Sequence, residues 1–141
     1  HTLVVAVLAL AACGRPAPAP APVVTTVASA DTVRVTVPAG TLVGTLQLPA
    51  GRAPFPAVLL ISGSGPTDRD GNSAGLGGKN DGLRQLAESL AARGIASVRW
   101  DKRGVGASRM PVAEKDVTLD TFVDDAVAWG QLLRGDPRVS T

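Results

Sequence analysis

Two stretches of small and charged residues in this 141-residue chain have compositions suited to chemistry. The first, residues 62–72 (SGSGPTDRDGN), follows the apolar run 57–61 (AVLLI) and has neither helical nor strand periodicity. The second, residues 101–108 (DKRGVGAS), follows the largely apolar run 95–100 (IASVRW). Loops beyond the carboxyl ends of buried strands are where folds of alternating strands and helices bind ligands. Both stretches are therefore candidate site loops.

Phosphate binding is one chemistry of glycine-rich loops, but both stretches depart from its patterns. Gly63-Ser64-Gly65 begins like the dinucleotide fingerprint G-x-G-x-x-G, yet Asp68 stands at the third glycine. Gly104-Val105-Gly106 meets Arg109 at that position, and residues 73–80 resemble a phosphate loop with the wrong first and last residues. The sequence therefore argues against a nucleotide site.

Calcium binding is a second possibility, because carboxylates and amides alternate in the first loop. Asp68, Asp70 and Asn72 have the spacing of calcium ligands. The sixth position of such a loop needs glycine and the twelfth needs glutamate, whereas this chain has Ser73 and Lys79. Solvated charges in a turn are the favoured interpretation, and we expect no metal and no cofactor.

The elements that hold these loops follow from hydrophobic periodicity. Residues 31–37 (DTVRVTV) alternate polar and apolar, and 41–48 (TLVGTLQL) do so less cleanly, which predicts an antiparallel hairpin turning at 38–40. Residues 57–61 suit a strand covered on both faces, and 95–100 a further strand.

Two amphipathic helices separate the later strands. The first has a stripe at helical spacing, with Asn80 or Asp81 as its cap and Gly94 as its stop. Its stripe is Leu83, Leu86, Ala87, Leu90 and Ala91. The second is capped by Thr118 and ends at Arg134-Gly135, with Asp120 near its positive end. Its stripe is Leu119, Phe122, Val123, Ala126, Val127, Gly130 and Leu133.

The order of elements is hairpin, strand, helix, strand, helix, and then the start of another strand at residues 138–141. Such alternation implies right-handed crossovers and a parallel sheet with helices on both faces. The fold class is therefore α/β. Both candidate loops would lie at one edge of that sheet, where such sheets bind ligands.

The sequences LLISGSGPTDRDGN and WDKRGVGAS, each following a strand, resemble the α/β-hydrolase superfamily. More narrowly, they are similar to EstD-type esterases and to the dienelactone-hydrolase-like and serine-aminopeptidase-like hydrolases. The resemblance extends from about Val33 to the end of the chain. That family often has His-Gly ahead of the first loop, where this chain has Ser62-Gly63.

The resemblance implies a carboxylic ester hydrolase that works through an acyl-enzyme and uses a small-molecule ester. By motif position, the backbone N–H of Ser64 would be one donor to the tetrahedral oxyanion. Gly63 and Gly65 would let the backbone turn that amide outward. A tight turn without a ligand is the alternative. The residues expected on the rim of the pocket are Asp68, Arg69 and Asp70.

The second loop has a mainly architectural role in the resemblance. There, an Asp-Arg pair and two glycines order the rim, and here Asp101 and Arg103 occupy the positions of that pair. Ser108 would open the following segment.

The acyl-enzyme mechanism also needs a nucleophile, an acid and a base, in the chain order Ser, Asp/Glu, His. The sequence contains no G-x-S-x-G, and its sole histidine is His1. We therefore expect residues 31–141 to be the N-terminal part of the hydrolase domain, inactive and not stably folded alone. A serine peptidase, a dienelactone-type hydrolase and a non-catalytic lipoprotein binding domain remain alternatives.

The start of the chain has features of a bacterial lipoprotein. Residues 3–12 (LVVAVLALAA) fit a signal-peptide core, and Leu10-Ala11-Ala12-Cys13 resembles a lipobox. This predicts a signal peptide over 1–12, truncated at its start, and a linker over 13–30 that carries a lipid on Cys13. A buried free cysteine is the alternative. The resemblance implies the periplasmic face of the cell envelope, with the outer membrane favoured by Gly14.

Composition excludes some partners. The net charge is +2, no Lys/Arg stripe appears, and only two Phe and two Trp could stack on bases, which argues against nucleic acid. Cys13 is the single cysteine, so the chain has neither a disulfide framework nor a zinc site of the cysteine type.

Overall fold

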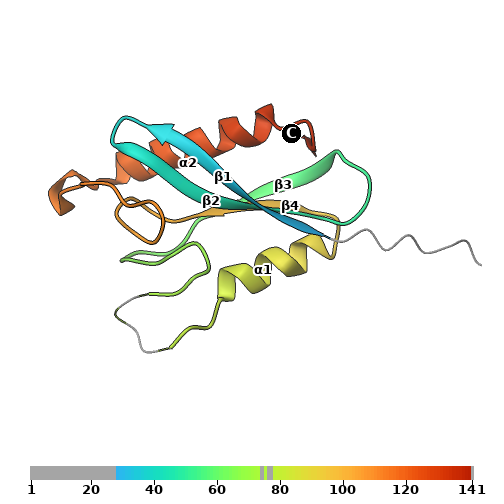
Figure 1. Ribbon diagram of the computed structural model, residues 1–141, viewed down its shortest axis with the longest axis horizontal. Helices are drawn as coiled ribbons and strands as arrows, with labels where there is room; N and C mark the ends of the chain where they lie inside the picture. Colours follow the sequence, from blue (N-terminus) through green and yellow to red (C-terminus); the bar gives the residue numbers. More distant parts are fainter. Residues whose placement is uncertain (1–27, 74, 76–77, 141) are drawn as a thin grey trace, which may run out of the picture.

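The computed structural model describes residues 28–73, 75 and 78–140, which form a twisted sheet with one long helix on each face (Figure 1). The predicted signal peptide, Cys13 and most of the predicted linker lie outside the described residues. The strands are β1 (Ser29–Val37), β2 (Gly40–Leu48), β3 (Phe55–Leu60), β4 (Ala96–Trp100) and β5 (Val139–Ser140). The helices are α1 (Gly82–Ala91), the 3-10 turn η1 (Glu114–Asp116) and α2 (Leu119–Gly135).

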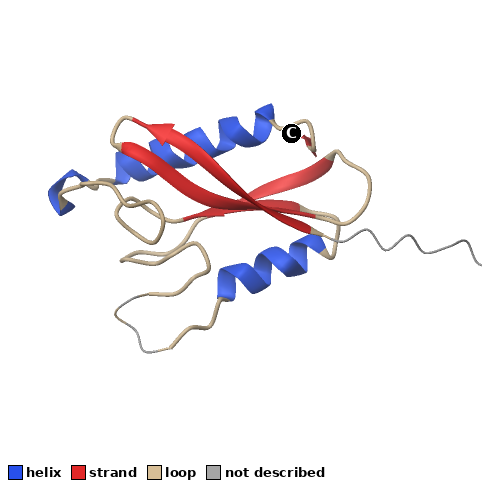
Figure 2. Ribbon diagram, viewed as in Figure 1, coloured by secondary structure: helices blue, strands red, loops and turns tan. Residues whose placement is uncertain are grey.

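The predicted hairpin and the parallel strands are confirmed. The strand order is β1-β2-β4-β3-β5, with β2 antiparallel to both β1 and β4. Strand β3 runs parallel to β4 and β5, so the crossovers through α1 and α2 return the chain to the same end of the sheet. Figure 2 shows the two helices on opposite faces of these strands, as the alternation of elements predicts.

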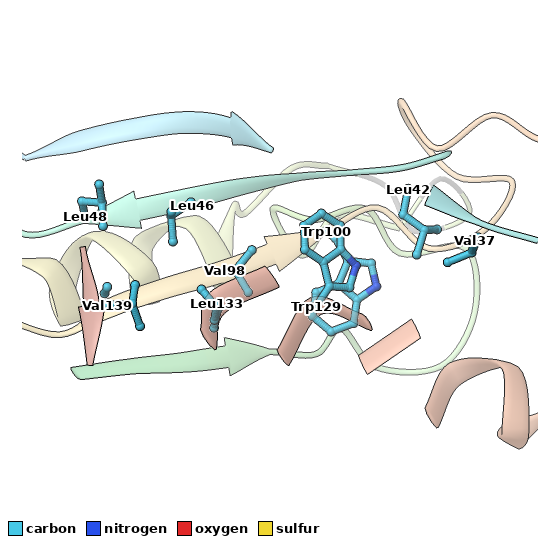
Figure 3. Close-up of a cluster of buried hydrophobic side chains, with 10 residues drawn as sticks. Val37, Leu42, Leu46, Leu48, Val98, Trp100, Trp129, Leu133 and Val139 are labelled. Atoms are coloured by element: carbon cyan, nitrogen blue, oxygen red, sulfur yellow. The ribbon is translucent and has the colours of Figure 1, made fainter. Parts of the chain in front are cut away.

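The core lies between the sheet and α2. Trp129 of α2 stacks on Trp100 of β4, with ring centroids 5.6 Å apart and planes inclined by 26°. Leu46 and Val98 lie beside these rings (Figure 3). A side chain at Gly44 would place its Cβ 2.8 Å from the Trp129 ring, so glycine at this position lets the ring approach the strand.

The inward face of α2 differs from the predicted stripe. The residues of this helix that are buried are Asp125, Trp129 and Leu133, whereas Val123 and Val127 are each 52% exposed. The helix is rotated because the Trp129 ring fills the core and the carboxylate of Asp125 pairs with Arg103 of the second loop. Its predicted cap is confirmed, since Thr118 Oγ1 accepts the N–H of Thr121.

Within the described residues, strand β3 is covered on one face. Phe55, Ala57 and Leu59 pack toward the core below α2, while Val58 on the opposite face is 38% exposed. Helix α1 packs mainly on β4 and β2 rather than on β3. Burial of the other face of β3 stays a prediction.

Of the two predicted caps of helix α1, Asn80 makes the hydrogen bond and Asp81 does not. Asp81 is the N-cap residue, at a left-handed φ of 50°, but its side chain makes no capping hydrogen bond. The N–H of Gly82 instead donates to Oδ1 of Asn80, over 3.0 Å. Leu86, predicted inside, is 45% exposed, and the buried residues of this helix are Ala87 and Ala91.

Candidate functional site

The two candidate loops lie side by side because the strands that precede them are parallel neighbours. Leu59 of β3 pairs with Val98 of β4, so both strands end at the same edge of the sheet. The N–H of Arg69 in the first loop donates to Oδ1 of Asp101 in the second, over 2.8 Å. The structure thus places the loops together as the fold class predicts.

Asp101 organises the second loop. Its side chain is buried, and Oδ2 accepts the N–H of Ala107 over 2.8 Å. Its backbone carbonyl accepts the hydroxyl of Ser108 over 2.7 Å, and that hydroxyl oxygen accepts the N–H of Val43 in β2 over 2.8 Å. Asp101 therefore holds together both loops, and Ser108 attaches the second loop to the sheet.

Asp101 and Arg103 do not pair with each other, contrary to what the resemblance suggests. Asp101 faces Arg69, with 3.8 Å between Nε and Oδ2. Arg103 forms a two-pronged pair with the buried Asp125 of α2, through Nη2 at 2.7 Å and Nε at 2.9 Å. This contact raises the pKa of Arg103. The second loop is thereby fixed to α2 as well as to the first loop.

Among the charged residues of the first loop, Asp68 closes a turn, and Arg69 and Asp70 anchor the loop to its neighbours. Oδ1 of Asp68 accepts the N–H groups of Asp70 and Asn72, at 3.0 and 2.8 Å, which closes a turn. Asp70 pairs with the buried Arg99 of β4, at 3.0 Å, and Arg69 contacts Asp101 as above. Asp68, Arg69 and Asp70 do not line either of the two cavities described below, and their predicted role at the substrate stays a prediction.

Lys102 holds the Gly63–Gly65 segment, and nothing in its pattern singled it out in the sequence. Nζ donates to the carbonyl of Gly63, at 2.5 Å, and to the carbonyl of Gly65. The residue is buried, and this burial lowers the pKa of Lys102. Thr67 Oγ1 also donates to the carbonyl of Ser64, at 3.2 Å. Three successive carbonyls of the loop are therefore held by side chains.

The N–H of Ser64 is unpaired among the residues that the structure describes. Gly65 has a φ of +79°, a conformation that glycine adopts without strain, as predicted from its place in the loop. Gly63 is not in that region, and an added Cβ there would meet no atom within 4 Å. The backbone conformation therefore requires glycine at 65 but not at 63.

Two cavities flank this segment. The first, of about 310 Å³, is lined by Ser62, Gly63 and Ser64 together with the apolar side chains of Ile61, Trp100, Leu119 and Phe122. The second, of about 540 Å³, lies on the side of Gly65, Arg103 and Val105. Lys102 and Phe122 line both cavities, and the ammonium lies 5.9 Å from the centre of the Phe122 ring. The unpaired amide of Ser64 thus belongs to a residue on the wall of an apolar cavity.

The described residues contain neither a cluster of metal ligands nor a helix that could span a membrane. No group of three or more His, Cys, Asp or Glu side chains within 28–73, 75 and 78–140 is arranged to hold a metal ion. Over these residues, neither helix has the length and apolar character needed to cross a bilayer.

Known proteins resemble both the sequence and the fold. No protein-family model matches the chain. Esterase EstD from Thermotoga maritima is 40% identical over 62 residues, which are 44% of this chain and 14% of EstD. This chain thus spans about one seventh of the length of that curated relative.

Solved structures of hydrolases share the fold. The 2,6-dihydroxy-pseudo-oxynicotine hydrolase aligns with a TM-score of 0.53 and 18% sequence identity. The alignment covers 79% of this chain and 27% of the hydrolase chain. The α/β hydrolase GrgF from Penicillium aligns over 79% and 34%, with a TM-score of 0.52 and 26% identity. An α/β serine hydrolase without a lid from Xanthomonas campestris aligns over 77% and 46%, with a TM-score of 0.52 and 23% identity.

Proposed function

We propose that this chain, which has the α/β-hydrolase fold, is part of a carboxylic ester hydrolase that works through an acyl-enzyme. The observation that carries the proposal is the Ser64 N–H, which has no acceptor among the described residues and belongs to a residue lining an apolar cavity. The local likeness to an esterase supports the same activity.

The proposed reaction gives each group a separate role. A serine nucleophile attacks the ester carbonyl, and the carbonyl oxygen becomes the oxyanion of a tetrahedral intermediate. The Ser64 N–H donates to that oxyanion together with the amide that follows the nucleophile. Loss of the alcohol leaves the acyl-enzyme, which water then hydrolyses. We propose that the nucleophile, acid and base belong to the part of the protein that follows Thr141.

The cavity beside Ser64 suits an uncharged acyl group. The side chains of Ile61, Leu119 and Phe122 that line it are apolar, and so is the indole ring of Trp100, which stacks on Trp129 of the core. An apolar wall next to hydrogen-bond donors is the usual form of a small-molecule site. The substrate we propose is therefore an ester whose acyl part is neutral.

The test uses the complete gene product, meaning the whole reading frame that encodes these 141 residues. We expect it to hydrolyse p-nitrophenyl acetate and butyrate and to react covalently with a fluorophosphonate probe. Faster turnover of peptide amides or of lactones would favour a peptidase or a dienelactone-type hydrolase instead. A complete protein that neither reacts with the probe nor hydrolyses any of these substrates would contradict the proposal.

We also propose that the protein is lipid-anchored through Cys13, which the lipobox-like Leu10-Ala11-Ala12-Cys13 supports. Two acyl chains would hold it stably at a membrane. Expression of the complete gene in a bacterium, with a clickable palmitate analogue, tests this. We expect label and membrane association in the wild type and neither in Cys13→Ser, and an unlabelled wild type would refute the anchor.

A further inference from the structure

Lys102 is a buried cation placed against backbone carbonyls rather than against a carboxylate. Its ammonium donates to the carbonyls of Gly63 and Gly65, which flank Ser64. Among the described residues it forms no ion pair, although charged lysine side chains are almost never fully buried unless paired. A buried lysine in this position needs a reason beyond packing.

We propose that Lys102 is a positioning residue that aims the N–H of Ser64 at the oxyanion, an inference that rests on the proposed ester hydrolysis. The carbonyl of Gly63 and the N–H of Ser64 belong to one peptide unit. In a planar trans peptide, the C=O and the N–H point in opposite directions. By holding the Gly63 carbonyl, Lys102 turns the Ser64 N–H away from itself.

The second hydrogen bond prevents the peptide from rotating. The carbonyl of Gly65 belongs to the peptide unit that ends at Pro66, which has no N–H. Lys102 therefore holds the segment on both sides of Ser64. The N–H groups of Ser64 and Gly65, which lie between the two anchored carbonyls, have no acceptor among the described residues. Thr67, through its contact with the Ser64 carbonyl, fixes the peptide unit in between.

A charged donor suits this task. Hydrogen bonds with an ionised partner are roughly twice as strong as those between neutral groups. The ammonium also lies near the face of the Phe122 ring, which offsets part of its desolvation. A methionine would fill the same space without either hydrogen bond, so the ammonium is what orders the loop.

A role for Lys102 as a general base is not supported. Such a base needs a hydrogen bond from the hydroxyl that it deprotonates. Within the described residues, Nζ makes no hydrogen bond with the hydroxyl of Ser62 or Ser64, and it donates to carbonyls instead. The geometry thus assigns Lys102 to the orientation of the loop and not to proton transfer.

The test compares Lys102→Met with Lys115→Met in the complete gene product. Lys115 is exposed on η1, lines neither cavity, and is the matched control. We expect kcat of Lys102→Met to fall about 100-fold, the effect of misplacing a catalytic group by ~1 Å, with KM changed little. Lys115→Met should keep the wild-type kcat, and Lys102→Arg, which retains a cationic donor, should recover part of the loss.

A boronic acid inhibitor separates positioning from general damage. It forms a tetrahedral adduct that needs the oxyanion donors, so its affinity should fall in parallel with kcat/KM. An unchanged kcat and boronate affinity in a folded Lys102→Met protein would overturn the inference. If wild-type protein is inactive toward every substrate and probe, the proposed function fails instead.

A structure of the wild type decides the question even if the variants do not fold. In a complex with a covalently bound phosphonate, we expect Lys102 to contact both carbonyls while the Ser64 N–H donates to the phosphonyl oxygen. Lys102 bound elsewhere, or the Ser64 N–H pointing away from that oxygen, would refute the proposal.

Discussion

Trp129 of α2 stacks on Trp100 of β4, and the same Trp100 lines the cavity next to Ser64. The core and the candidate site therefore share one side chain. Trp129 is fully buried, so Trp129→Ala should lower the free energy of unfolding by about 3–5 kcal/mol. The loss of support behind Trp100 should also lower kcat/KM of the complete protein.

Urea unfolding measures the first effect, and Trp129→Phe is its control. Among the described residues, Nε1 of Trp129 has no hydrogen-bond partner. Replacing Trp129 by phenylalanine therefore breaks no hydrogen bond and keeps an aromatic ring against Trp100. We expect Trp129→Phe to lower the free energy of unfolding clearly less than Trp129→Ala does. Equal losses in the two variants would show that the stacked ring is not what stabilises the core.

The Ser64 amide can be tested by removing its hydrogen. Ser64→Pro lacks the N–H, whereas Ser64→Ala keeps it and removes only the hydroxyl. Loss of one oxyanion donor lowers kcat by about 100- to 1,000-fold, which is the result expected for Ser64→Pro. Steady-state hydrolysis of p-nitrophenyl butyrate by the complete protein checks this. A large loss in Ser64→Ala would instead indicate that the hydroxyl acts.

The sequence predicts features that a short segment determines, and it does not predict contacts between residues that are far apart in the chain. The hairpin depends on period-two alternation and the cap of α2 depends on Thr118, and both are properties of short segments. The rotation of α2 depends on Asp125 finding Arg103 and on Trp129 finding Trp100, both far away in sequence. The adjacent aspartates Asp124 and Asp125, between Phe122 and Trp129 on a largely apolar helix, were the available signal.

The same division applies to the candidate site. The place of both loops followed from the order of strands and helices. The hydrogen-bond partners within the site could not be predicted in this way. Lys102 donates to backbone carbonyls, and every residue has such a carbonyl, so the residue types do not identify its partners. The pairing of Arg69 with Asp101 and of Asp70 with Arg99 likewise joins segments whose register only the folded sheet fixes.

The buried pair Arg103–Asp125 should behave as a unit. Asp125→Ala leaves the Arg103 guanidinium buried without its carboxylate, which should cost about 3–5 kcal/mol of unfolding free energy. The double variant Arg103→Met with Asp125→Leu removes both charges, and we expect it to be more stable than Asp125→Ala. Thermal or urea unfolding of the three proteins measures this. A double variant that is no more stable than Asp125→Ala would contradict coupling between the two residues.

Gly106 and Gly104 form a matched pair for the second loop. Both have a positive φ, of +52° and +76°. A Cβ at Gly106 would lie 2.5 Å from Oδ2 of Asp101, whereas one at Gly104 would meet no atom within 4 Å. Gly104→Ala should therefore cost only the backbone strain, of order 1 kcal/mol. Gly106→Ala should cost more and should also loosen the contact between Asp101 and Arg69, as unfolding and activity measurements would show. Equal effects of the two substitutions would refute the role of Asp101 in shaping this loop.

Acid should weaken the junction between α2 and β5. Hydrogen bonds from Arg138 hold the pKa of Asp136 below its ordinary value of 3.8. The folded state therefore binds this proton less readily than the unfolded chain, and the stability from the ionised carboxylate is fully present above pH 3.8. It is lost as the pH falls from there through the lower pKa of the folded state. When the free energy of unfolding is measured over this pH range, it should fall less steeply with decreasing pH in Asp136→Asn than in the wild type. Identical slopes would mean that the pair between Arg138 and Asp136, at 2.8 Å, does not contribute to folding.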